Sequence, residues 1–149
     1  MHTASKVKQA GQRSAGVVVL RDRPGRCSYT LLRAYSHRVF SKGLLETGEQ
    51  AIAAARREVE EETGITQLDF RWGYDYFETG HYRHGKIARY YSAATSQPKV
   101  ERRISQELGR PEHDEYRRVS FEEGHELPGV RLQPELEWAH HKTGCLLMD

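Results

Sequence analysis

Four glutamates lie within five consecutive positions of this chain, namely Glu58, Glu60, Glu61 and Glu62. On an α-helix, positions 58, 61 and 62 share one face, while position 60 points elsewhere. Like charges at these spacings cost an isolated helix roughly a few tenths of a kcal/mol per pair, yet no basic residue follows within one turn. An acidic run can simply be a solvated helix face. The alternative is a cation held against this face, and carboxylate oxygens best suit Mg²⁺ or Mn²⁺.

The residues around the glutamates predict a single helix from about residue 49 to residue 63. The segment Thr47-Gly48-Glu49-Gln50 has the form of a capping box, in which Thr47 caps the helix and Gln50 reaches back to it. Gly64 follows as a typical stop signal. A narrow apolar stripe that suits packing on a sheet is formed by Ile52, Ala55 and Val59. The helix is therefore expected to be apolar on one side and acidic on another.

The rest of the chain alternates between strand-like and turn-like segments. Apolar or aromatic-rich runs predict strands at residues 14–20, 29–32, 68–77, 86–94 and 116–121. Residues 21–26 and 81–85 are expected to be turns between paired strands, and residues 95–113 a long polar connection. Residues 132–142 predict a C-terminal helix with Pro134 in its first turn. Strands with two helices predict an α/β protein, an α/β/α sandwich around a mixed β-sheet.

Length and composition favour one domain, residues 1–149, with residues 1–13 as a frayed N-terminus. The formal net charge of +2 is too small to indicate a protein that binds duplex DNA. Two cysteines are too few for a disulfide framework, so reduced thiols and a cytoplasmic location are expected. No apolar stretch is long enough to span a membrane, and no signal peptide is expected. The oligomeric state does not follow from the sequence.

The segment from Gly43 to Ile65 carries a second signal, which is the spacing of particular residues. Five residues separate Gly43 from Glu49, and seven more precede Arg57. The full pattern is Gly43, Glu49, Arg57-Glu58, Val59, Glu61-Glu62, Gly64 and Ile65. It resembles the signature of the Nudix hydrolases at every defined position. That resemblance implies the same α/β/α sandwich, a need for divalent metal, and hydrolysis of nucleoside diphosphates linked to another moiety.

The resemblance also implies metal ligands within this segment, which we call the box. Glu58 would be a metal ligand and, as in some family members, the general base. Glu61 and Glu62 would be core metal ligands. Glu49 would help to hold a further metal ion, and the backbone carbonyl of Lys42 would complete the coordination.

Arg57 is a further member of the box. The resemblance implies that it orients the catalytic carboxylates, which is nearly the same claim as a salt bridge that holds the helix. With two or more Mg²⁺ ions bound, the site would neutralise phosphate oxygens, position a water and stabilise the leaving phosphate. The identity of the carboxylate that accepts the proton of the water stays open.

A second constellation lies outside the box, in the sequence PEHDEYR at residues 111–117. It resembles the EHxxYRW element of the diadenosine tetraphosphate hydrolases, a Nudix branch, and a related PExxxxRW element of RNA 5′-pyrophosphohydrolases. On this match Glu112 would supply an additional catalytic and metal-binding carboxylate, with Glu115 as the next candidate. His113 would contact phosphate. The plain alternative is a hydrophilic loop.

Likeness to the same branch continues at the approach to the box and around residues 85–91. It implies that Lys42 and Lys86 contact phosphate. One tyrosine would stack on a base, although alternation along a strand places some of them in the core, and the candidates are Tyr82, Tyr90 and Tyr91. Two departures affect the substrate rather than the metal chemistry. The Pro-Lys-Gly-His of the branch is Ser41-Lys42-Gly43-Leu44 here, and its Arg-Trp is Arg117-Arg118.

We therefore expect a Mg²⁺-dependent hydrolase, with Mn²⁺ as a possible substitute, that cleaves a phosphoanhydride in a dinucleoside polyphosphate such as diadenosine tetraphosphate. Within the same class, the alternatives are an RNA 5′-pyrophosphohydrolase or a hydrolase of another nucleoside diphosphate derivative. A nucleotide-sensing Nudix module without catalysis is the alternative outside it. The expected partner is a small nucleotide or an RNA 5′ end, and neither a membrane nor duplex DNA.

Overall fold

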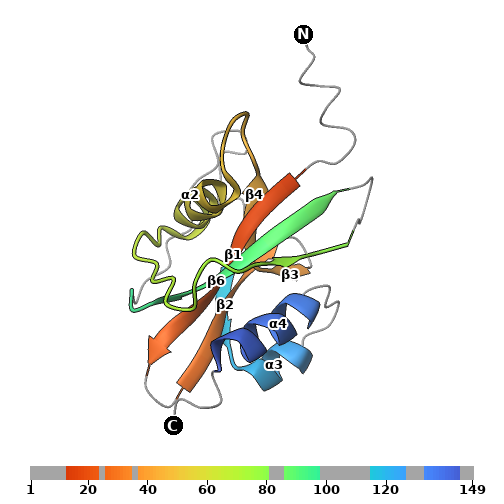
Figure 1. Ribbon diagram of the computed structural model, residues 1–149. Helices are drawn as coiled ribbons and strands as arrows, with labels where there is room; N and C mark the ends of the chain where they lie inside the picture. Colours follow the sequence, from red (N-terminus) through yellow and green to blue (C-terminus); the bar gives the residue numbers. More distant parts are fainter. Residues whose placement is uncertain are drawn as a thin grey trace.

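The computed structural model describes residues 13–23, 26–34, 37–80, 86–97, 115–126 and 133–144. Within these ranges the chain forms a seven-stranded sheet with helices on both faces (Figure 1). The strands are β1 (Arg13–Arg23), β2 (Arg26–Ala34), β3 (His37–Val39), β4 (Ser41–Leu44), β5 (Phe77–Glu78), β6 (Ile87–Thr95) and β7 (Glu115–Val119). The helices are α2 (Ala51–Thr63), α3 (Phe121–Glu126) and α4 (Gln133–Thr143). In the described part of the chain, no helix is long and apolar enough to cross a membrane.

Strand β1 is the centre of the sheet. It pairs in parallel with β6 and antiparallel with β2 and β4. The strand order is β3-β2-β1-β6-β5, with β4 paired to β1 and β7 paired to β2. The small and β-branched residues of β1 suit a strand that is covered on both faces. The mixed sheet between helices confirms the predicted α/β class.

Alternation along β1 divides the core into two clusters. Val17 and Val19 lie on the face covered by α2, where Val59 packs against them. Val18 lies on the opposite face, in a cluster with Leu136 of α4. We call these two sides of the sheet the α2 face and the α4 face. The parity of a residue in its strand therefore tells which helix its side chain meets.

The start of α2 differs from the prediction. The helix begins at Ala51, and Gln50 stands at the N-cap without a side-chain capping bond. Thr47 and Gly48 lie in a turn, where the Glu49 N–H donates to the Glu46 carbonyl at 2.9 Å. The predicted capping box is therefore wrong, because residues 46–49 close a turn of their own. The predicted stop at Gly64 is confirmed by its left-handed backbone, with φ of 76°.

Two other predicted elements need correction. Within the predicted strand at residues 68–77, Asp69 forms an isolated bridge with Ala94, and only Phe77 belongs to a strand, the short β5. The last strand ends at Val119, because Ser120 caps a short helix, α3, that the sequence pattern did not predict. Strands β3 and β4 were also not predicted. The C-terminal helix is confirmed as α4, with Pro134 at its second position. The predicted turn at 81–85 lies outside the described residues, as does most of the connection at 95–113.

Candidate active site

Within the box, carboxylates of helix α2 lie against strand β4, which precedes the helix in the sequence. The Glu58 carboxylate lies directly against the backbone of Gly43. A Cβ at position 43 would come within 2.0 Å of the Glu58 carboxyl carbon and 2.3 Å of both its oxygens. Two residues earlier, the Ser41 hydroxyl donates to Glu62 Oε1 at 2.6 Å. Ser41 and Gly43 thus face α2, and two of the predicted carboxylates lie side by side along β4.

Arg57 is the basic group that balances this acidic surface. Its Nε and Nη2 donate to the two oxygens of Glu49, at 2.9 and 3.0 Å. Its Nη1 donates to Glu58 Oε2 at 2.8 Å and to Glu61 Oε1 at 3.2 Å. A fifth bond reaches the Leu44 carbonyl at 3.0 Å. One guanidinium therefore ties the helix to the loop before it and fixes three of the carboxylates predicted for the site.

Burial and charge shift the pKa values of Glu49 and Glu58 in opposite directions. Hydrogen bonds from Arg57 and from the Glu46 backbone N–H lower the pKa of Glu49 to about 2. The pKa of Glu58 is raised, chiefly because the carboxylate is removed from water, and the neighbouring charge of Glu61 adds to this effect. Arg57 and a hydrogen bond with Glu62 act in the opposite direction. Glu58 is therefore held close to other carboxylates at some electrostatic cost.

The donor chemistry of this cluster fits a divalent cation. Its ligands would be hard carboxylate oxygens, which Mg²⁺ and Mn²⁺ prefer. Gly43 leaves room for Glu58 where any side chain would fill the space. Within the described ranges, however, no three acidic, histidine or cysteine side chains already form a metal-binding group. The carboxylate oxygens are instead engaged by Arg57 and Ser41, so a cation would compete with these donors.

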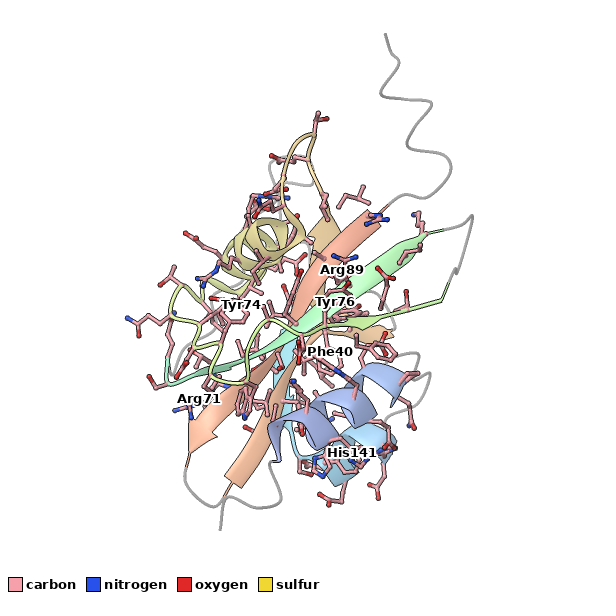
Figure 2. All side chains as sticks on the ribbon, viewed as in Figure 1. Phe40, Arg71, Tyr74, Tyr76, Arg89 and His141 are labelled. Atoms are coloured by element: carbon pink, nitrogen blue, oxygen red, sulfur yellow. The ribbon has the colours of Figure 1, made fainter. Side chains whose placement is uncertain are left out.

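Two predicted substrate-binding residues lie on the other side of β4 and β6. Lys42 pairs with Gly16 of β1, and a Cβ at position 16 would come within 2.7 Å of Lys42 Cβ. Both therefore belong to the α4 face, as does Phe40, which packs in the α4-face cluster (Figure 2). Lys86 directly precedes β6 and has the same parity as Ala88, a member of that cluster. The two lysines are thus placed on one face, opposite the side from which Glu58 and Glu62 approach.

The expectation that Tyr90 stacks on a base does not fit its position. The residue is 4% exposed and belongs to the α4-face cluster. Its ring meets Phe40 edge-on, with centroids 6.3 Å apart. A ring enclosed in this way leaves no open face for a ligand. Alternation along β6 placed this tyrosine in the core.

Three other predicted site residues, Tyr82, Glu112 and His113, lie outside the described residues, and their roles stay predictions. Glu115 is placed only as the first residue of β7, opposite Arg33 of β2. The sequence interpretation missed Ser41, although a signal was present. The branch that the chain resembles has proline there, and serine adds a hydroxyl donor that reaches Glu62.

Comparison with known proteins agrees with this geometry. Residues 11–140 match the family model of the NUDIX domain, and the chain belongs to the Nudix family. The box and the family together identify a pyrophosphohydrolase, an enzyme class that generally uses divalent metals and binds small nucleotide substrates. No curated protein sequence matches the chain.

Several solved structures share the fold. A C. elegans Ap4A hydrolase in a binary complex is 22% identical, with 91% of this chain and 97% of that chain covered and a TM-score of 0.69. A NUDIX-family hydrolase from Clostridium perfringens is 15% identical, with 90% and 97% covered and a TM-score of 0.66. The E. coli dihydroneopterin triphosphate pyrophosphohydrolase is 19% identical, with 87% and 96% covered and a TM-score of 0.61. At these identities the similarity establishes the fold alone.

Proposed function

We propose that this Nudix protein is a Mg²⁺-dependent hydrolase that cleaves a phosphoanhydride bond in a dinucleoside polyphosphate such as diadenosine tetraphosphate. The observation that carries the hydrolase chemistry is the contact between Glu58 and the backbone of Gly43, beside the Ser41–Glu62 bond. The substrate is inferred from the element at residues 111–117 that resembles the diadenosine tetraphosphate hydrolases. The similarity in fold to the C. elegans Ap4A hydrolase agrees with that inference.

In this proposal the metal would be held by Glu58, Glu61 and Glu62, with the Lys42 carbonyl completing the coordination and Glu49 available to a further ion. Bound Mg²⁺ supplies charge neutralisation at the phosphates and a water of lowered pKa. Arg57 contributes by holding the carboxylates in register, because it bonds to several of them at once.

Hydrolysis also needs a protein group that accepts the proton of the attacking water. A carboxylate has to accept a proton from the attacking water, and the candidates are Glu58 and Glu112. His113 and Lys86 are proposed to contact phosphate, and Tyr82 to stack on a base. The cytoplasmic location expected from the two cysteines stays a prediction. The alternative substrates are triphosphorylated RNA ends and other nucleoside diphosphate derivatives. Each of them is tested in the hydrolysis assay described below.

The metal assignment is tested by single substitutions assayed with diadenosine tetraphosphate and Mg²⁺. Glu61→Gln and Glu62→Gln should each lower kcat by at least about 10²-fold, because a ligand charge is lost. Glu60→Gln is the matched control, since Glu60 is an exposed glutamate of the same helix on a different face. Near-normal rates for both variants, at saturating Mg²⁺, would contradict the metal site.

The same assay separates an enzyme from a sensor. Turnover that stops on chelation of the metal supports hydrolysis. A sensor would bind nucleotide tightly without metal and would form no product from diadenosine tetraphosphate, triphosphorylated RNA or nucleoside diphosphate derivatives. That result would contradict the proposal of an enzyme. Product identities by chromatography tell which of the three substrates is cleaved.

The carboxylate outside the box needs its own variant. Glu112→Gln should lower kcat without changing the thermal unfolding midpoint, because the predicted role is chemical and not structural. Glu115→Gln is the comparison. An unchanged rate in the first variant and a reduced rate in the second would move the role to Glu115.

A further inference from the structure

Ser41 is a buried polar residue of the α2 face that the box does not include. It lies in β4 opposite Val17 of β1, a member of the α2-face cluster, so its side chain points toward α2. Helix α2 runs beside β4 (Figure 1). The Ser41 hydroxyl donates to Glu62 Oε1 at 2.6 Å, and the two residues are 4% and 8% exposed. A hydroxyl on a paired strand therefore holds one particular oxygen of a buried carboxylate.

The hydrogen bond between Ser41 and Glu62 has the length of a strong one. Bonds from a hydroxyl to an ionised carboxylate are about 2.5–2.7 Å long and roughly twice as strong as bonds between neutral groups. Because both residues are buried, water competes little for either partner. The backbone of Ser41 is fixed by the ladder between β4 and β1, whereas a glutamate side chain can turn about several bonds. The hydroxyl thus fixes the orientation of the Glu62 carboxyl group.

The other carboxylates of the acidic face are oriented in a different way. Glu58 and Glu61 accept hydrogen bonds from the same guanidinium nitrogen of Arg57, and the Glu61 side chain is 57% exposed. Glu62 is far more buried, and it also shares a hydrogen bond with Glu58. Two carboxylates in contact repel each other when both are ionised, and a cation between them removes the repulsion. Glu62 is thus the buried carboxylate of this pair, and Ser41 sets its orientation.

Divalent cations differ in the number of carboxylate oxygens that they need. Ca²⁺ is bound by about six to eight oxygens, and a carboxylate ligand of Ca²⁺ can give both of its oxygens. Mg²⁺ is smaller, demands a near-ideal octahedron, keeps several waters and needs only one or two carboxylates. Cavity size, ligand number and ligand flexibility therefore decide between the two ions. A carboxylate that cannot turn freely is a restraint of this kind.

We propose that Ser41 is a positioning residue that keeps Glu62 as a metal ligand through one oxygen and thereby favours Mg²⁺ and Mn²⁺ over Ca²⁺. This inference rests on the proposed function, because it takes Glu62 to be a metal ligand. A cation that takes one oxygen leaves the bond to Ser41 in place. A cation that takes both oxygens competes with the hydroxyl for Oε1 and turns the carboxyl group away from it, which costs affinity. Ser41 then acts on the metal only through Glu62.

The test is equilibrium binding of metal ions to the full chain without nucleotide, so that it does not depend on hydrolysis. Mn²⁺ is followed by the electron paramagnetic resonance signal of the free ion, and Ca²⁺ by its competition with bound Mn²⁺. In Ser41→Ala, Mn²⁺ should bind about 10- to 100-fold more weakly, because Glu62 is no longer held in position. Ca²⁺ should bind as well as in the wild type or better, since Oε1 is released. The ratio of the Mn²⁺ affinity to the Ca²⁺ affinity should therefore fall at least about tenfold.

Two further variants separate the effect of the hydroxyl from that of the substitution. Ser41→Thr keeps the hydroxyl donor and should retain the wild-type ratio of affinities. Ser92→Ala is the matched control, because Ser92 is a fully buried serine of β6 whose hydroxyl has no hydrogen-bond partner among the residues that the structure describes. Alternation along β6 places Ser92 on the α4 face, away from the box. Its replacement should change the affinity for neither ion.

A purely structural role for Ser41 predicts a different set of results. The lost hydrogen bond would then lower the thermal unfolding midpoint of the metal-free protein and weaken both ions by the same factor. An unchanged affinity ratio in Ser41→Ala would overturn the proposal and leave the metal site standing. Wild-type protein that binds neither ion would overturn the proposal together with the metal site. Hydrolysis of diadenosine tetraphosphate is measured separately, and its absence would remove the proposed function while the affinity ratio still decides on Ser41.

Discussion

The two faces of the sheet hold their polar groups in different ways. On the α2 face, one guanidinium makes four hydrogen bonds to carboxylates, and Ser41 holds a further one. On the α4 face, the buried His140 has Tyr29 as a hydrogen-bond partner, whereas Glu135 Oε1 has no partner among the residues that the structure describes. The first face is a dense network built from one stretch of chain. The second is an apolar core that holds a few isolated polar groups.

The largest expected effect tests how closely the α2 face is packed. Gly43→Ala would place a Cβ within 2.0 Å of the Glu58 carboxyl carbon, so the carboxylate has to move. We expect kcat to fall by about 10²-fold or more, because a misplaced ligand misorients the metal and water. Gly80→Ala is the control, since a Cβ there meets nothing within 4 Å. Equal activity of the two variants in the hydrolysis assay would show that Glu58 does not need its place against β4.

A smaller effect is expected when position 57 keeps its positive charge but loses the planar guanidinium that bonds to several carboxylates at once. Arg57→Lys retains a cation and loses the fork that bonds to both oxygens of Glu49. Activity should fall about tenfold, and the free energy of unfolding by about 1–2 kcal/mol after allowance for partial exposure. Arg56→Lys is the matched control, because Arg56 lies over the Phe70 ring and touches no box carboxylate. Urea unfolding and kcat with Mg²⁺ are the measurements, and full activity in Arg57→Lys would mean that charge alone is needed.

The polar groups of the α2 face come from one stretch of sequence, whereas those of the α4 face come from distant positions. This difference explains which of them the sequence could predict. The residues of the box lie within one stretch, so their spacing along a helix was enough to bring Glu58 and Glu62 to one site. Tyr29 and His140, which share a hydrogen bond on the α4 face, lie 111 positions apart in the sequence, and no local pattern relates them. Periodicity also fails over most of residues 68–77, where Leu68 and Phe70 pack against the α2-face cluster without belonging to a strand. Tertiary contacts override β-propensity there.

The α4 face gives a prediction that depends on pH. His140 is 8% exposed, shares a hydrogen bond of 2.9 Å with the Tyr29 hydroxyl and stacks on Phe121 with centroids 3.7 Å apart. Burial lowers the pKa of His140. The charges of His141 and His125 act in the same direction, whereas those of Glu122 and Glu137 oppose it.

A histidine with a lowered folded-state pKa stabilises the protein fully above its unfolded pKa of about 6.5, and this stability is lost as the pH falls through the folded value. The thermal unfolding midpoint should therefore fall between pH 7 and pH 5 in the wild type, by about 2–4 °C for each kcal/mol lost. His140→Gln should show a weaker dependence from a lower starting value. Identical pH profiles would mean that other groups control acid stability.

The smallest expected effect compares the starts of two helices. Ser120 and Glu123 form a reciprocal capping box at α3, with bonds of 3.0 and 2.8 Å, whereas the similar pattern at Thr47 and Gln50 forms none. Ser120→Ala should reduce the free energy of unfolding by about 1 kcal/mol, because a backbone N–H loses its acceptor. Thr47→Ala should change it by less than about 0.5 kcal/mol, as is usual for an exposed turn residue. Equal losses in the free energy of unfolding would mean that Thr47 stabilises the start of α2 in solution, as Ser120 stabilises the start of α3.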